Sequence, residues 1–333
     1  MIDRGVLHSA PARSFLAALE AEIDAHPALN HAFLQRFAEE KLDREQLIEF
    51  AIQHYMYSRC FVRNVAAVVS NVPDEHARSL LIQNMYEEVG EPLKQRDRAY
   101  VLLLEVGLVT PEQVAAALTA VGPHGDVTAH LIEQGLLTRE ALDALVQSRT
   151  AQLLELTHPA LFRRFLRSLG VSPEVVATAE PLPETSQFVR EFEGICRHGH
   201  WLEAMGALGP GTETVVPRIY EAILAGIRHS GEVTPNDYVF WTIHVHCDEG
   251  HGENILLAIE PYLDHPENQL LVRRGVLRVL NARKLWFDSL ERMVFRPRRC
   301  FGAVDAVGAV GAVGTLGTLG TLGTLAEVAQ EAS

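Results

Sequence analysis

The amino-acid sequence predicts an all-α protein with seven or more helices around one core. Three observations lead to this class. Nearly every segment repeats its apolar residues at helical spacing, proline, glycine and capping residues separate these segments, and no run alternates convincingly enough to be a strand. The 333 residues are enough to bury a sizeable core, and 47% hydrophobic with 22% charged residues is the composition of an ordinary soluble globular protein.

Eight segments have the apolar periodicity of amphipathic helices. In chain order they are residues 14–23, 32–40, 44–69, 74–88, 187–203, 212–228, 235–260 and 266–287. Helix-breaking and capping residues stand between them: Pro27 follows the first segment, Pro73 and Asp74 open the fourth, and Pro235 begins the seventh. The main core is therefore predicted to consist of residues 1–92 and 151–295.

Residues 98–150 differ in character because they contain a two-copy repeat. The sequence of residues 103–118 returns in altered form at residues 131–146. Each copy ends a short helix at a glycine (Gly107 or Gly135) and caps the next helix with a threonine (Thr110 or Thr138). The two helix pairs are predicted to pack into a small module inserted in the main domain.

The repeat resembles the helix pairs at the amino end of type II secretion and pilus ATPases, some of which bind cyclic di-GMP. The Arg-Leu-Gly and the terminal glutamine that such binding uses are missing, since Arg98-Ala99-Tyr100 stands in the first copy and Asp126-Val127-Thr128 in the second. We therefore expect a structural or docking role, which leaves a protein partner at residues 98–150 open.

The carboxyl-terminal residues 301–333 form a low-complexity tail. Gly-Ala-Val and Gly-Thr-Leu triplets repeat there without the proline of collagen and without a period that would bury a face. The sequence predicts disorder for this segment.

Charge and cysteine content limit the environment of the protein. The formal charge of −14 argues against nucleic acid and anionic membranes as partners. No uninterrupted apolar stretch approaches the roughly 18 residues of a membrane span, and the amino terminus lacks the pattern of a secretory signal. Four scattered cysteines without a CxxC pair indicate reduced thiols, so we expect a cytoplasmic protein.

Residues 240–251 carry the strongest functional pattern. His244, Asp248 and His251 are spaced i, i+4 and i+7, which on a helix places them at about 0°, 40° and −20°, in one stripe. Apolar residues, among them Trp241, project to the same side, so the stripe faces the core. A metal ion is the most direct compensation for two imidazoles and a carboxylate on a buried face. A hydrogen-bonded cluster that only ties helices together is the structural alternative. His246 lies near 200° and is left out.

Three further candidate ligands lie near helix ends. Glu87 and Glu88 close the segment 74–88, His158 opens a helix just before Pro159, and Glu213 follows a Gly-Pro-Gly sequence in the first turn of the segment 212–228. Each is weak alone, because a glutamate in the first turn of a helix usually serves only the helix dipole.

Together these residues resemble the six-ligand set of the heme-oxygenase-like diiron oxidases, in the order Glu88, His158, Glu213, His244, Asp248 and His251. The resemblance extends to the phrases Tyr-Glu-Glu-Val-Gly, His-Pro-Ala-Leu-Phe, Gly-Pro-Gly-Thr-Glu and Cys-Asp-Glu-Gly-His, and spans residues 14–92 and 151–290. Glu88 is favoured over Glu87, and Glu213 is a candidate bridge between two ions. The chain departs from the family in one respect, since the repeat module separates Glu88 from His158.

The resemblance implies a heme-oxygenase-like bundle of about seven core helices that binds two Fe(II) ions per chain. Members of this family cleave or desaturate fatty acids and amino acids, oxygenate nitrogen, or build p-aminobenzoate from their own side chains. We therefore expect an oxidoreductase that uses O₂ on a small amino-acid-like or fatty-acid-like substrate in a biosynthetic pathway. No catalytic residue beyond the ligands is assigned, and a homodimer is left open.

Two other functions are compatible with the same helical scaffold. The first is a cofactorless oxidase or hydrolase of the pyrroloquinoline-quinone-synthase or thiaminase type, with histidine and glutamate as acid and base. The second is a non-enzymatic nucleotide sensor or adaptor, suggested by the repeat module. Iron content separates the first expectation from both alternatives.

Overall fold

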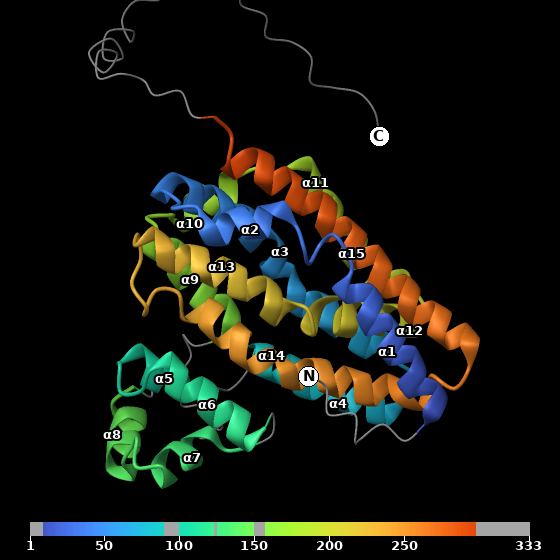
Figure 1. Ribbon diagram of the computed structural model, residues 1–333, viewed down its shortest axis with the longest axis horizontal. Helices are drawn as coiled ribbons and strands as arrows, with labels where there is room; N and C mark the ends of the chain where they lie inside the picture. Colours follow the sequence, from blue (N-terminus) through green and yellow to red (C-terminus); the bar gives the residue numbers. More distant parts are fainter. Residues whose placement is uncertain (1–8, 90–99, 123–124, 150–156, 298–333) are drawn as a thin grey trace, which may run out of the picture. The chain divides into compact units, whose positions relative to one another are not determined.

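The computed structural model describes residues 9–89, 100–122, 125–149 and 157–297. Within these ranges the side chains of residues 87, 101, 102, 105, 146–149 and 246–249 are not described. The described backbone contains helices and connecting segments and no strand, which confirms the all-α prediction (Figure 1). The expected tail, residues 301–333, lies outside the described residues.

The helices follow in chain order. They are α1 (Ala10–Asp24), α2 (Ala32–Glu39), α3 (Arg44–Asn71), α4 (Glu75–Val89), α5 (Tyr100–Glu105), α6 (Pro111–Val121), α7 (Val127–Glu133), α8 (Arg139–Arg149), α9 (His158–Ser168), α10 (Pro173–Thr178), α11 (Pro183–His198), α12 (Trp201–Leu208), the π-helical turn η3 (Gly209–Glu213), α13 (Val216–Ser230), α14 (Val239–Ile259), the 3₁₀ turn η4 (Glu260–Tyr262) and α15 (Pro266–Val294).

Local sequence accounts for where the central helix α3 begins and which face it buries. The Asp43 side chain accepts a hydrogen bond from the Gln46 backbone, and the Gln46 side chain accepts one from the Asp43 backbone, so two unpaired amides of the first turn are satisfied. Phe50, His54 and Tyr57 then follow at helical spacing and are all buried. One face of α3 therefore enters the core.

The long helices pack around a shared aromatic core. Helix α11 contacts α3 and α15, α12 lies along α15, and α13 packs against α2 and α14 (Figure 1). Helix α14 also contacts α4 and α9, and the turn η3 contacts α12, α14 and α15. The elements predicted to carry ligands therefore meet in the interior.

Several predicted helix boundaries were wrong. Helix α1 begins at Ala10 instead of residue 14, α14 begins at Val239 instead of Pro235, and α15 continues to Val294 instead of ending at residue 287.

Two further segments differ in how their helices are divided. The segment 187–203 is two helices, because α11 ends at His198 and the His200 side chain caps α12 by accepting a hydrogen bond from the Leu202 amide at 3.2 Å. The segment 212–228 does not begin at Thr212, because a π-helical turn continues from α12 through Glu213 and α13 starts at Val216.

Glycines explain how the π-helical turn fits into the core. A Cβ at Gly209 would overlap the Ile255 side chain of α14, and a Cβ at Gly211 would overlap the Val279 side chain of α15. The turn can therefore approach both helices closely only because these two positions have no side chain. This close approach carries Glu213 into the interior.

The described parts of the repeat, residues 100–122 and 125–149, contain the predicted short helices. Gly107 and Gly135 both adopt a positive φ, at 71° and 69°, at the ends of α5 and α7. Thr110 and Thr138 each accept a backbone hydrogen bond, from Gln113 and Ala141, at the start of the next helix. Helices α5 and α6 contact α14. The division of the chain into a core domain and an inserted module remains a prediction.

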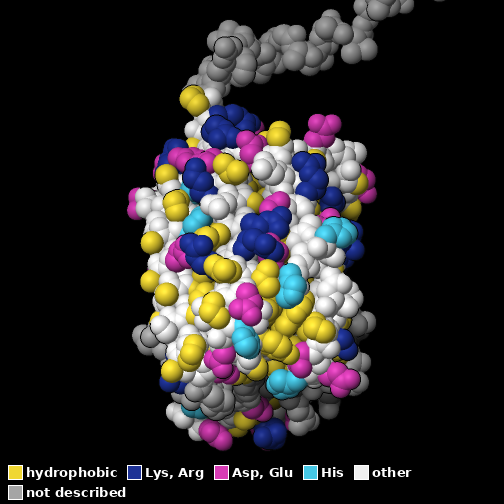
Figure 2. Space-filling model, turned by 90° about the vertical axis from the view of Figure 1, so that its right-hand side faces the viewer, with side chains coloured by type: hydrophobic (Ala, Val, Ile, Leu, Met, Phe, Trp, Pro, Cys, Tyr) yellow, Lys and Arg dark blue, Asp and Glu magenta, His cyan; other side chains and the backbone are white. Residues whose placement is uncertain are grey.

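The described residues between 9 and 296 group as one compact unit. On the face shown in Figure 2, acidic, basic and apolar side chains are interspersed. None of the helices in the described part of the chain is both long and apolar enough to cross a membrane.

Close packing of α12 on α15 yields a stability prediction. A Cβ at Gly275 of α15 would overlap the Glu203 carbonyl oxygen of α12, so Gly275→Ala forces the helices apart. We expect a loss of about 1–3 kcal/mol in the free energy of unfolding, measured by chemical denaturation.

The matched control is Gly194→Ala in α11, where a Cβ would meet nothing within 4 Å. This change should stabilise the protein by up to about 1 kcal/mol, because alanine has the higher helix propensity. Equal effects of the two substitutions would contradict the close contact between α12 and α15.

Candidate metal centre

The structure brings five of the six predicted ligands together. Glu88 stands in the last turn of α4, His158 is the first residue of α9, Glu213 ends the π-helical turn, and His244 and His251 come from α14. All five side chains are buried. Asp248 lies on α14 between the two histidines, but its side chain, like that of Glu87, is outside the described residues.

The five side chains form two groups that share Glu88. The first consists of Glu88, His158 and His244, whose ligand atoms lie within 4.8 Å of one another. The Nδ1 atom of His158 is 3.0 Å from Oε2 of Glu88, and the His158 and His244 ring centroids are 4.4 Å apart.

The second group consists of Glu88, Glu213 and His251, again within 4.8 Å. Nδ1 of His251 lies 3.6 Å from Oε1 of Glu88 and 3.8 Å from Oε2 of Glu213. The two Glu88 oxygens thus face different groups. This geometry favours Glu88 as the shared carboxylate, whereas the sequence suggested Glu213.

Hydrogen bonds outside the two groups orient the histidines. The Phe240 carbonyl accepts a hydrogen bond from Nδ1 of His244 at 2.7 Å, which leaves Nε2 as the ligand atom. The Asn84 side chain of α4 donates to the His251 carbonyl at 2.9 Å and accepts from Asn254 at 2.8 Å. These bonds hold α14 against α4, the helix that carries Glu88.

Burial and neighbouring charges separate the pKa values of the two glutamates. Burial raises the pKa of Glu88, but the charge of His158 and its hydrogen bond outweigh that effect and hold the pKa at about 2. Burial, reinforced by the negative charge of Glu88, raises the pKa of Glu213 despite its contact with His251. Burial and the nearby His158 lower the pKa of His244 to about 3, so its imidazole is neutral.

The donor set fits iron. Among the described residues, the ion-pair partners of Glu88 and Glu213 are histidines, with no lysine or arginine beside either carboxylate. Neutral imidazoles combined with buried carboxylates suit Fe(II) and leave coordination positions open for other ligands. Without a metal ion, burying histidines and glutamates together would cost free energy of folding.

A cavity of about 30 Å³ adjoins the two groups. Its lining consists of Tyr57, Ser58, Phe61, Val62, Glu88, His158, Pro159, Thr212, Glu213, Val216, Tyr220, Phe240 and His244. This volume holds about two water-sized species. Ser58, Phe61, Val62 and Pro159 are only half-buried and form its outer side, so a larger molecule entering from outside would meet these residues first.

Sequence reasoning missed several polar residues around this cavity. Arg283 of α15 is completely buried, donates to the Thr212 hydroxyl at 3.4 Å, and lies over the Tyr57 ring at 5.6 Å from its centroid. His54 forms a hydrogen bond with Tyr220. The sequence could have indicated that Arg283 is buried, because Arg283 follows Val276, Val279 and Leu280 at helical spacing on an apolar face.

Two models of known protein families match this chain. A family model described as iron-containing redox enzyme matches residues 113–284, more than half of the chain. A second model, of the TENA/THI-4/PQQC family, matches residues 21–111.

Curated relatives and solved structures extend these matches. A 4-aminobenzoate synthase of Nitrosomonas europaea is 24% identical over 278 residues, covering 83% of this chain and 91% of its own. A 4-chloro-allylglycine synthase of Streptantibioticus cattleyicolor is 26% identical over 138 residues, covering 41% and 53%. The crystal structure of a CADD-like protein of unknown function from Nostoc punctiforme superimposes with a TM-score of 0.58 at 13% identity, covering 86% and 99%. That likeness concerns the fold.

The raised pKa of Glu213 predicts proton release when Fe(II) binds. A proton on Glu213 competes with the metal, so Fe(II) affinity should rise as pH increases through the raised pKa and then level off. Glu88, with a pKa of about 2, releases no proton in this range. Anaerobic calorimetry between about pH 5 and pH 8, in buffers of different ionisation enthalpy, counts the released protons.

Glu213→Gln serves as the comparison, because glutamine keeps the shape and carries no carboxyl proton. The other ligand residues are the same in both proteins, so the difference in proton release belongs to Glu213. Identical release by the variant and the unmodified protein would show that Glu213 is already ionised before the metal binds.

Proposed function

Because this chain belongs to the iron-containing redox enzyme family, we propose that it is a non-heme diiron oxidase or oxygenase that uses O₂ to oxidise a small organic substrate. One observation carries the proposal: Glu88 presents one carboxylate oxygen to each of two groups of ligand residues. A shared carboxylate between two ligand groups supports two Fe(II) ions per chain.

The proposed ligand set is Glu88, His158, Glu213, His244, Asp248 and His251. His158 and His244 would hold one iron with Glu88, while Glu213 and His251 would hold the other. Asp248 is included because its place on α14, four residues after His244 and three before His251, puts it on the same stripe of the helix. Bound iron would supply the electrons that reduce O₂.

The residues of this chain have three tasks in that chemistry. Glu88 and the histidines hold the metal, and their hydrogen bonds to Phe240 and Asn84 limit ligand movement. The apolar side chains that line the cavity exclude bulk water from the reacting species. Phe61 and Val62 at the outer side favour an apolar group on the substrate that approaches there.

The products named for two relatives bear on the substrate class. Both a 4-aminobenzoate synthase and a 4-chloro-allylglycine synthase form small products that carry an amino and a carboxylate group. This supports an amino-acid-like substrate and a biosynthetic pathway for the present chain, ahead of a fatty-acid-like substrate.

The match of residues 21–111 to the TENA/THI-4/PQQC family supports one second candidate, a cofactorless oxidase or hydrolase. In that case Glu88 and His158 would act as acid and base across their 3.0 Å hydrogen bond. The two candidates differ in their need for iron.

We expect anaerobic Fe(II) titration to give about two irons per chain by elemental analysis, followed by O₂ uptake on exposure to air. His251→Ala should abolish O₂ uptake, because it removes the histidine that contacts both Glu88 and Glu213. The matched control is His198→Ala, at the exposed end of α11, which should retain iron and O₂ uptake.

Turnover by metal-free protein, or failure to bind any iron, would overturn the diiron proposal in favour of the cofactorless candidate. Equal loss in His198→Ala would show that the effect of His251→Ala is unrelated to iron ligation.

A further inference from the structure

A buried histidine and a buried tyrosine form a hydrogen-bonded pair beside the candidate metal centre. His54 of α3 is 1% exposed and Tyr220 of α13 is 3% exposed. Nε2 of His54 lies 2.8 Å from the Tyr220 hydroxyl oxygen. Tyr220 lines the cavity, and its ring centroid is 5.4 Å from that of His244. The pair thus connects the ligand residues with the aromatic core.

The hydrogen bond has a defined direction. Burial, helped by the positive charge of Arg283, holds the pKa of His54 well below its usual range, so the imidazole is neutral. A neutral imidazole offers one lone pair, and a phenol is a stronger acid than a neutral imidazole N–H. Tyr220 therefore donates its hydroxyl proton to Nε2 of His54 in the hydrogen bond.

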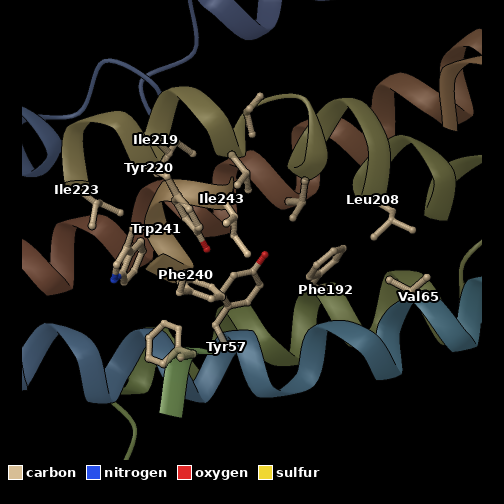
Figure 3. Packing of buried hydrophobic residues seen from close by; sticks show 14 of the residues in the cluster. Tyr57, Val65, Phe192, Leu208, Ile219, Tyr220, Ile223, Phe240, Trp241 and Ile243 are labelled. Atoms are coloured by element: carbon tan, nitrogen blue, oxygen red, sulfur yellow. The ribbon is translucent and has the colours of Figure 1, made fainter. Parts of the chain in front are cut away.

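A second buried tyrosine provides a contrast. Tyr57 also lines the cavity and is 4% exposed, but its neighbour is the Arg283 guanidinium. A guanidinium has no lone pair to accept a proton, and its positive charge opposes removal of an electron from the ring beside it. Figure 3 shows Tyr57 and Tyr220 pointing from opposite helices into the same interior region. Of the two, Tyr220 has the neighbour that favours loss of both an electron and a proton.

We propose that Tyr220 is a redox-active residue that gives one electron to the iron centre once that centre has reacted with O₂, while its phenolic proton passes to His54. This inference rests on the proposed function. The O–H bond of Tyr220 breaks, its electron reduces the oxidised iron centre, and its proton binds Nε2 of His54. The products are a neutral tyrosyl radical and an imidazolium.

The surroundings of His54 favour return of the transferred proton to Tyr220, because burial and the Arg283 charge disfavour the imidazolium. Aromatic rings enclose its imidazole, with Phe162 stacked at 5.5 Å and Trp241 at 4.9 Å between ring centroids. Nδ1 of His54 has no hydrogen-bond partner in the described part of the chain, so no second acceptor there draws the proton away. The proton returns to Tyr220 when the radical is reduced, so His54 acts as a positioning residue and local proton acceptor.

The pair also provides an electron that complete reduction of O₂ requires. Two ferrous ions provide two electrons, whereas full reduction of O₂ to water takes four. A side chain that donates an electron limits damage when no substrate is present to provide it. Trp241, whose ring centroid is 4.9 Å from that of Tyr220, is the next oxidisable group in the core.

The test uses the full chain loaded with Fe(II) under argon, mixed with O₂ without substrate, and frozen for electron paramagnetic resonance. O₂ uptake is recorded in parallel. We expect a narrow organic-radical signal that narrows further when the protein contains ring-deuterated tyrosine. Tyr220→Phe should lose the signal, and the matched variant Tyr57→Phe should keep it.

A second variant acts on the other end of the hydrogen bond. His54→Gln leaves the phenol and the ligand residues in place, so it tests the pair even where Tyr220→Phe disturbs iron binding. We expect roughly tenfold less radical in this variant, because the amide is a far weaker proton acceptor.

The two readouts separate this inference from the proposed function. O₂ uptake without a tyrosyl signal, or an undiminished signal in Tyr220→Phe or His54→Gln, would overturn the role of Tyr220 and leave the diiron proposal intact. Absence of O₂ uptake by iron-loaded protein would overturn both.

Discussion

Glu88 and Glu213 are buried beside three histidines, and the charge of these two carboxylates has to be compensated in the protein interior. Isolated carboxylates in a protein interior cost several kcal/mol each, so their charge must be compensated at the same place. Histidines partly do this, since His158 and His251 both contact Glu88. The pKa of Glu213 nevertheless stays raised, which indicates that the histidines compensate the negative charge incompletely. A metal ion is the natural completion of this set.

The helices are arranged to deliver these side chains to one point. Glu88 is the last buried residue of α4, and His158 begins α9, so both come from helix ends, where the chain enters or leaves the core. Glu213 comes from a π-helical turn, a feature often associated with functional sites. Only α14 contributes from its middle, with His244 and His251 on one stripe. The site therefore depends on loop ends and an irregular turn as much as on regular packing.

Much of this could be predicted from sequence because the relevant signals were local. The stripe of His244 and His251 follows from helical periodicity, and the caps at Thr110 and Asp43 follow from residue type. The break at Gly199 and the π-helical turn at Gly209 could not be predicted in this way, since they depend on which helices approach each other. For the same reason, the shared position of Glu88 and the pairing of His54 with Tyr220 became visible only in three dimensions. Those contacts join residues far apart in the chain, and no local pattern encodes them.

X-ray diffraction from crystals loaded with Fe(II) under argon would show whether two irons are held on either side of Glu88. Anomalous difference maps at the iron absorption edge locate each ion without reference to the protein coordinates. We expect two peaks, one beside His158 and His244 and the other beside Glu213 and His251, with Glu88 contacting both. A single peak, or iron bound only outside these two groups, would contradict this arrangement.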